Sequence, residues 1–247
     1  MKALRPLVAA WICALALPAF AAPYMLIKPG QTEVGSGNAV VVGSQVMLSG
    51  GKSVDGEMIS EDREIEADFA GLIVEAPVEV VYRVTSGKRM AKITAPKEAQ
   101  DALVLISDGR VLTLKLSRGV ALPRKAKIEL QGPKIATAAV VGVASVNVNG
   151  VSGKSFKAVV KGPGLLVVKG TVSAVEASLT GAGTLDLSGL KADTSTAKLA
   201  GQGTIKTFAT QAVLADAQGG GNILIEGDPP KTDVSVAGTT YVSVAKP

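Results

Sequence analysis

A repeat of 18 to 20 residues runs through the second half of the chain and limits the possible folds more than any other feature. Six segments align without gaps, and the steps between their leading glycines are 20, 19, 20, 18 and 19 residues. These glycines are Gly142, Gly162, Gly181, Gly201, Gly219 and Gly238. Because a fixed period of this length is typical of solenoids, the sequence predicts an all-β, parallel β-solenoid of about six coils.

Each copy of the repeat carries two pairs of alternating apolar positions, one on each side of the glycine turn. The positions before the turn are Ala138, Ala158, Ala177, Ala197, Ala215 and Val234, followed two residues later by Val140, Val160, Leu179, Leu199, Ala217 and Val236. The positions after the turn are Val146, Leu166, Leu185, Ile205, Ile223 and Val242, followed by Val148, Val168, Leu187, Thr207, Ile225 and Val244. A period of two indicates strands, so we predict two strands per coil and four interior columns.

The positions between the columns are mostly polar, and we expect them to face outward. They include Lys157, Glu176, Asp186, Lys198 and Lys206. The glycines fit a chain that turns sharply in every coil, where a positive φ or a close backbone approach is needed. A Gly-x-Gly motif also occurs in dinucleotide-binding sites, but there it occurs once, between a strand and a helix. Here it recurs between strands, which favours a structural turn.

The region before the repeat also alternates, but without the period. Residues 63–131 contain several such runs, so we expect strands there. The segment PKEAQDAL (96–103) predicts one short helix with Pro96 in its first turn. Ser-Asp-Gly-Arg at 107–110 predicts a hairpin turn.

We therefore divide the chain into four parts. Residues 61–132 are predicted to form an N-terminal β cap that covers one end of the solenoid, which occupies residues 133–247. Residues 22–60 are either a linker or extra edge strands, and within them GSGNAVVVG (35–43) resembles a single copy of the repeat. Residues 1–21 are predicted to be a signal peptide.

The signal peptide follows from the order of charge, apolar residues and small residues. Lys2 and Arg5 precede an apolar run over residues 7–17, and Ala-Phe-Ala at 19–21 supplies a cleavage site. The run is shorter than the roughly 20 residues that a membrane-spanning helix needs. We therefore expect an exported protein in the periplasm, on the outer surface or secreted, with no membrane span after cleavage.

The composition excludes several kinds of chemistry. The chain has no histidine, and its single cysteine, Cys13, lies in the predicted signal. Histidine-based catalysis, disulfides and thiolate metal sites are thereby removed from the mature chain. The chain has 26 basic and 21 acidic residues, and loss of Lys2 and Arg5 with the signal leaves a net charge of +3. This charge is too small to indicate nucleic acid as a partner.

Three residue groups remain as possible sites, and we interpret none of them as one. The first two are a serine–lysine cluster and a carboxylate cluster, namely Ser152, Lys154, Ser155 and Lys157, and Glu61, Asp62, Glu64 and Glu66. Both patterns are typical of exposed strand faces. The third is the segment 181–187, which loosely resembles a calcium-binding repeat, but Asp186 is its one carboxylate and the other copies have no Asp at that place. We predict no catalytic, cofactor-binding or metal-binding residue.

The pieces that carry a family resemblance are DFAGLIVEAPVEVVYRVTSGKR after Arg63, LISDGRVLTLKL, and turn-strand copies such as LTGAGTLDLSG and LAGQGTIKTFA. Together they resemble the putative auto-transporter adhesin, head GIN domain family of exported bacterial proteins. The first and last copies differ from the family pattern, with Val143-Ala144 and Thr239-Thr240 in place of a glycine-containing turn. The resemblance implies a right-handed β-solenoid with an adhesive or surface role, and it carries over no catalytic residue.

Our leading hypothesis is a non-catalytic exported scaffold that binds a surface, a polysaccharide or another polymer, or a partner protein. One alternative is a periplasmic structural or stress protein that contacts another envelope protein. The other is a carbohydrate-active β-helix enzyme. A sugar groove normally needs aromatic stacking faces, and the mature chain has six scattered aromatic residues: Tyr24, Phe69, Tyr82, Phe156, Phe208 and Tyr241.

Overall fold

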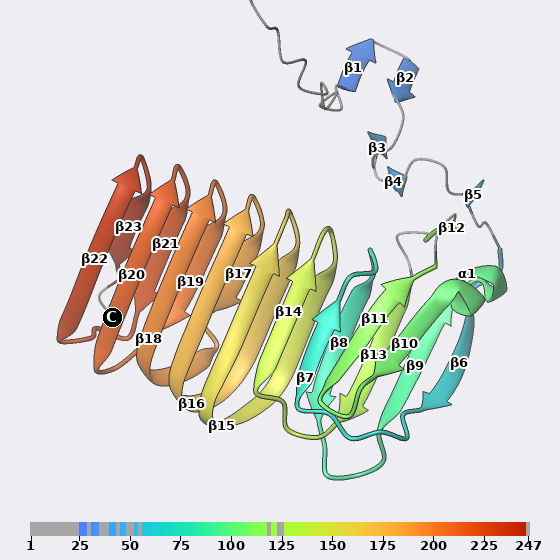
Figure 1. Cartoon of the computed structure of the whole chain (residues 1–247), viewed down its shortest axis with the longest axis horizontal. Helices are drawn as coiled ribbons and strands as arrows, with labels where there is room; N and C mark the ends of the chain where they lie inside the picture. The colour runs from blue at the N-terminus through green and yellow to red at the C-terminus, as the bar shows by residue number, and fades with distance from the viewer. Residues whose placement is uncertain are drawn as a thin grey trace, which may run out of the picture.

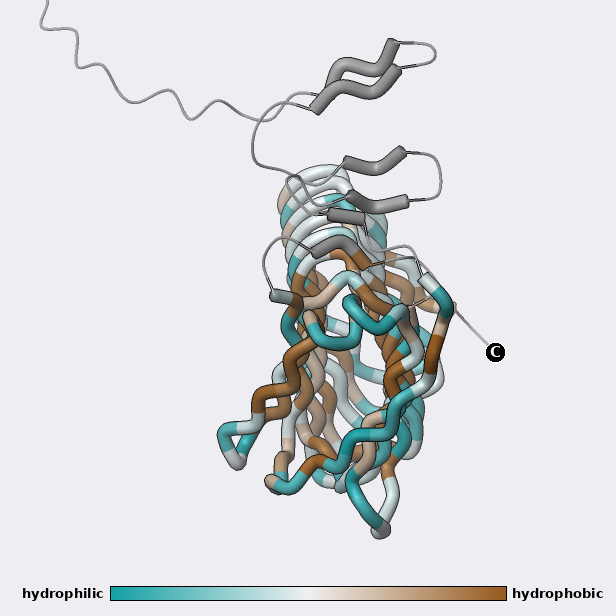
Figure 2. The backbone as a smooth tube through the Cα atoms, turned by 90° about the vertical axis from the view of Figure 1, so that its right-hand side faces the viewer, coloured by the Kyte–Doolittle hydropathy of each residue, from teal (hydrophilic) through white to brown (hydrophobic). Residues whose placement is uncertain are grey.

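The protein is a parallel β-solenoid whose strands stack along one axis (Figure 1). The computed structural model describes residues 56–117, 120–122 and 126–245, together with five short strands between residues 25 and 53. Seen from the N-terminal end, successive coils superimpose as a narrow loop (Figure 2). The all-β parallel solenoid predicted from the repeat is confirmed.

Two sheets form the broad sides of the solenoid. The first face contains β10 (Leu103–Ser107), β11 (Val111–Leu116), β7 (Gly71–Val74), β14, the C-terminal parts of β15 and β16, and then β18, β20 and β22. The second face contains β6 (Ile59–Glu64), β9 (Met90–Ala95), β13 (Lys127–Gly132), β8 (Glu79–Val84), the N-terminal parts of β15 and β16, and then β17, β19, β21 and β23. The bounds of the strands in the repeat are β14 Thr137–Val141, β15 Ser145–Lys161, β16 Leu165–Gly181, β17 Thr184–Leu187, β18 Leu190–Gly201, β19 Thr204–Phe208, β20 Ala212–Gly219, β21 Asn222–Glu226, β22 Lys231–Gly238 and β23 Tyr241–Val244.

The four predicted columns are confirmed by the strand register. Each coil pairs with the next so that Ala158 lies beside Ala177 and Leu185 beside Ile205. The column residues are buried through the body of the rod, and they alternate with half-buried or exposed positions. The last coil differs, because Val234 and Val236 are 41% and 43% exposed.

A further row of buried side chains, in addition to the four columns, comes from the segment that returns from the second face to the first. β15 and β16 run through this return without a break, so the coil is extended there as well. The row contains Phe156, Val175, Ser195 and Val213. Ser195 also explains the one polar residue in the predicted columns: its Oγ lies 2.7 Å from Oγ1 of the buried Thr207, so each hydroxyl has a hydrogen-bond partner.

The region before the repeat continues the same stack out of sequence order. β7 (Gly71–Val74) and β8 (Glu79–Val84) pair in parallel with β14 and β15 of the first repeat coil. β11 (Val111–Leu116) and β13 (Lys127–Gly132) then pair in parallel with β7 and β8. The strands predicted from alternation are therefore present, and their buried residues, such as Leu72 and Ile128, extend the columns.

Antiparallel strands and one helix finish the N-terminal end. β10 (Leu103–Ser107) pairs with β11 through the predicted turn, where Asp108 Oδ1 accepts the N–H groups of Arg110 and Val111. β9 (Met90–Ala95) and β6 (Ile59–Glu64) extend the second face. The predicted helix is α1 (Lys97–Ala102), but Pro96 is its N-cap with ψ 151°, not a residue of its first turn.

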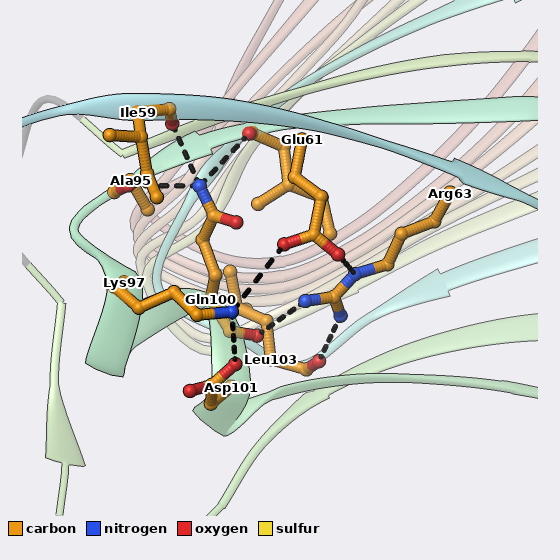
Figure 3. A network of polar contacts seen from close by, with 9 residues as sticks. Ile59, Glu61, Arg63, Ala95, Lys97, Gln100, Asp101 and Leu103 are labelled. Atoms are coloured by element: carbon orange, nitrogen blue, oxygen red, sulfur yellow. Dashed lines mark hydrogen bonds and ion pairs between the residues drawn. The ribbon is translucent and has the colours of Figure 1, made fainter.

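A polar network ties these N-terminal elements together (Figure 3). The fully buried Gln100 of α1 donates Nε2 to the carbonyls of Ile59 (2.7 Å) and Ala95 (3.0 Å). Arg63 of β6 donates to the carbonyls of Leu103 (3.2 Å) and Gln100 (3.1 Å). The network therefore bridges β6, β9, α1 and β10 across this end of the solenoid.

The remaining described strands lie before residue 54 or in a short connection. β1 (Met25–Lys28) pairs antiparallel with β2 (Gln31–Val34), and β3 (Val40–Val42) pairs antiparallel with β4 (Gln45–Met47). β5 (Lys52–Ser53) pairs with β12 (Val120–Ala121). The predicted signal peptide at 1–21 lies outside the described residues, as does most of the repeat-like segment at 35–43.

Candidate functional site

The Gly-x-Gly motifs are structural turns. Gly181 and Gly201 have φ of +114° and +129°, a region that L side chains rarely adopt. A Cβ on Gly201 would also overlap the carbonyl oxygen of Gly181 in the preceding coil. The second glycine of the motif is needed for packing, because a Cβ on Gly183 would lie 2.7 Å from the carbonyl oxygen of Gly162. Both glycines therefore serve the stacking of coils.

The structure places both residue clusters considered in the sequence at exposed or half-buried positions. Ser152, Lys154 and Ser155 are exposed on β15. Among the carboxylates, Glu61 pairs with Arg63 at 3.1 Å and Glu64 lies 4.0 Å from Lys88. Both carboxylates are therefore paired with basic side chains at the N-terminal end of the solenoid. In the described part of the chain, no three acidic residues, cysteines or histidines come together as metal ligands would.

Asp186 takes part in a local turn and a weak ion pair. Its Oδ1 accepts the backbone N–H (3.1 Å) and the hydroxyl (2.6 Å) of Ser188, and its Oδ2 lies 3.9 Å from Nζ of Lys206. Ser188 and Lys206 thus engage both carboxylate oxygens of Asp186. Calcium needs six to eight oxygen ligands, and the segment 181–187 offers one carboxylate.

We therefore predict that chelation leaves the stability unchanged. Melting of the purified chain should occur at the same temperature with and without EDTA, because folding of the coils depends on apolar columns and backbone pairing. Circular dichroism during heating measures this. A fall of several degrees on adding EDTA, reversed by calcium, would show that Asp186 belongs to a metal site.

The predicted outward lysines lie on both faces of the rod, and two of them are paired. Lys157 on the first face contacts Glu176 at 3.0 Å, and Lys206 on the second face lies near Asp186. Lys161 and Lys198 are exposed on the first face and Lys169 is exposed on the second. The positive charge is therefore spread over both faces.

A groove of about 570 Å³ lies on the first face near the C-terminal end. Three consecutive strands line it, β18, β20 and β22, at the edge where each strand enters the face. Its lining residues are Thr194, Ser195, Thr196, Ala212, Val213, Leu214, Pro230, Lys231, Thr232 and Asp233. We call it the first-face groove. Leu214, one of the lining residues, is 45% exposed, although the equivalent position in preceding coils is Lys157, Glu176 or Thr196.

The groove offers groups that can bind a ligand. Its threonine hydroxyls can donate and accept hydrogen bonds, Lys231 and Asp233 add one charge of each sign, and Leu214 supplies an apolar contact. The alternation of the repeat does not predict this groove, although Leu214 in an outward, otherwise polar row is a signal of it. A second hollow of about 450 Å³ lies between β6 and β10 beside Arg63.

Within the described residues, the aromatic side chains do not gather on the surface as a sugar platform would. Phe69 and Tyr82 are buried and pack edge to face with their ring centroids 6.2 Å apart, and Phe156 is buried in the core. Tyr82 donates its hydroxyl to the carbonyl of Pro133, and burial raises the pKa of this phenol well above its usual value. Tyr241 is exposed, on the second face at the last coil.

Comparison with known proteins places the chain in a family. The family described as "Putative auto-transporter adhesin, head GIN domain" matches residues 68–229, about two thirds of the sequence. The chain belongs to this family, as the turn-strand copies indicated. A search of curated proteins finds no match.

Solved structures share the fold. A putative adhesin from Bacteroides fragilis NCTC 9343 superposes with a TM-score of 0.63 at 19% identity, over 79% of this chain and 100% of that one. A putative adhesin from Parabacteroides merdae ATCC 43184 gives 0.51 at 17% identity, over 80% and 100%. Within the described residues, no helix is long and apolar enough to cross a membrane.

Proposed function

We propose that the protein is an exported, non-catalytic, adhesin-like rod that binds an extended polymer or a surface through the first-face groove. The observation that supports this most directly is the groove itself, which crosses three stacked strands and is lined by hydroxyl groups, a lysine and a leucine. Membership of an adhesin family agrees with this role. The absence of a histidine from the whole sequence counts against most acid–base chemistry.

The geometry fits an extended ligand better than a small one. The groove is open and its lining residues occupy equivalent positions of three stacked strands, so a polymer chain that runs along the solenoid can contact β18, β20 and β22 together. Each contact is weak, because hydroxyl groups exchange one hydrogen bond with water for one with the ligand. Tight attachment would then come from many contacts or many copies acting together.

The test is binding of the purified chain to cells, to envelope fractions and to anionic polysaccharides at several salt concentrations. Lys231→Glu and Leu214→Ala should each reduce binding several-fold, because they remove the cation and the apolar contact of the groove. Lys154→Glu is the matched control, since Lys154 is exposed outside the groove and the change in charge is the same. If both lysine variants lose binding equally, the groove is not the site.

The same experiment separates the other two roles. Binding to envelope fractions but not to whole cells would favour a structural role inside the envelope. Cleavage of a polysaccharide, abolished by one carboxylate substitution, would show an enzyme and contradict the proposal. Fractionation of the producing cells into periplasm, outer membrane and medium would test export.

A further inference from the structure

The two ends of the solenoid are finished in different ways. At the N-terminal end, α1 and the hydrogen bonds of Gln100 and Arg63 bridge the two sheets, and Glu61 and Arg63 place charge on the outermost strand β6. Inward or edge charges and a covering helix are the usual protection of a sheet edge against pairing with another chain. At the C-terminal end, the last described strands are β22 and β23, and nothing in the described part of the chain covers them.

The C-terminal end exposes the continuation of the core. Its four column residues are Val234, Val236, Val242 and Val244, which we call the end face. Val234, Val236 and Val244 are 41%, 43% and 43% exposed, whereas Ala215, Ala217 and Ile225, their neighbours in the preceding coil, are fully buried. In the described residues, β22 pairs with β20 alone and β23 with β21 alone, so the outer edge of each strand keeps unpaired backbone groups. The end face is therefore equivalent to the surface through which each interior coil contacts the next one.

We propose that the end face binds the end face of a second copy of this chain, which gives a tail-to-tail dimer with two-fold symmetry. A two-fold axis perpendicular to the solenoid reverses the partner's strands, so the edges of β22 and β23 pair antiparallel with strands of the second copy. The capped N-terminal end does not offer a complementary surface. The contact is therefore isologous and closes after two copies, instead of growing into a fibre.

The residues of the end face suit such self-pairing. In the antiparallel register centred on Ser235, Val234 lies opposite Val236 of the second copy, and Asp233 lies opposite Ala237. In the register of β23 centred on Ser243, Val242 lies opposite Val244. Valine faces valine in both strands, and no like charges oppose each other, which would destabilise the pair.

The size of the end face predicts a weak dimer. The eight residues of β22 span about 27 Å and the two sheets lie about 10 Å apart, so each copy contributes on the order of 300 Å². Two copies bury roughly 600 Å², below the usual range of stable interfaces. The dimer should therefore depend on concentration. It would also place the two first-face grooves on the same side of the dimer, because Lys231, Thr232 and Asp233 of β22 line the groove.

The test is sedimentation equilibrium of the purified chain from about 5 μM to 500 μM, a range in which a weak dimer is detected by its dependence on concentration. We expect a monomer–dimer equilibrium, and Val236→Lys should weaken it at least about tenfold because it places two ammonium groups in an apolar contact. Val141→Lys is the control, since Val141 is 37% exposed on the first face at the opposite end of the repeat. A monomer at every concentration, or an open series of larger species, would overturn the proposal.

A cross-linking measurement reports the same contact without altering the valines. In a Cys13→Ser background, Ser235→Cys should give a disulfide-linked dimer on mild oxidation, because directly opposed Cβ atoms in antiparallel strands lie about 4.5 to 5.5 Å apart. Ser178→Cys occupies the same outward row in an interior coil and should remain monomeric. Equal cross-linking of the two variants would contradict a specific end-to-end contact. This result is independent of whether the groove binds a polymer.

Discussion

Leu185→Asp should destabilise the protein severely. Leu185 is fully buried in the middle of the solenoid, between Leu166 and Ile205 of the neighbouring coils. The substitution loses about 1.5 to 3 kcal/mol of apolar burial and places a carboxylate in a site without a polar partner. The total loss is several kcal/mol, which is a large part of the roughly 5 to 15 kcal/mol that stabilises a typical domain. Urea unfolding followed by circular dichroism measures it.

Two further variants separate the column from its surroundings. Lys206→Ala removes an outward side chain with one distant ion pair, so its effect should stay below about 1 kcal/mol. Val242→Asp changes the same column in the last coil, where the residue is half-buried, and should cost less than Leu185→Asp. If Leu185→Asp unfolds at the same urea concentration as the unaltered chain, the assigned register is wrong.

The repeat determined most of the fold because its physical cause is local. A side chain in one coil packs on the equivalent side chain of the next, so the alternation around Leu185 or Ile223 predicted burial, strand and register together. The return segment was less visible. One buried row consists of Phe156, Val175, Ser195 and Val213. The side chains differ from coil to coil, and the polar Ser195 interrupts the apolar pattern by which a column is recognised in the sequence.

The N-terminal end could not be derived from the sequence in the same way. β7 and β8 lie directly against the first repeat coil, while β11 and β13, which follow later in the chain, lie farther out. The alternation of residues 63–131 does not predict this order, because the order depends on which strand edges pair with each other across distant parts of the chain. The groove escaped notice for a related reason: it depends on how three strand ends line up, and Leu214 alone signalled it.

Gly201→Ala should also destabilise strongly, for a reason that lies in the backbone. Gly201 has φ of +129°, and the added methyl would overlap the carbonyl oxygen of Gly181. A side chain in this conformation costs roughly 1 to 2 kcal/mol, and forcing the coils apart adds about 1 to 3 kcal/mol. We expect a loss of about 2 to 5 kcal/mol in the free energy of unfolding, measured by the same urea titration.

Gly153→Ala is the matched control for this prediction. Gly153 lies in β15, its φ is outside the left-handed region, and a Cβ there meets no atom within 4 Å. Alanine at such a position lowers the conformational entropy of the unfolded chain. The control should therefore be neutral or should raise the free energy of unfolding by up to about 1 kcal/mol. A large loss for Gly201→Ala beside no loss for Gly153→Ala would show that the glycine turns hold the coils at their stacking distance. Equal effects would mean that the turns tolerate side chains, and that the period of the repeat is maintained by the columns alone.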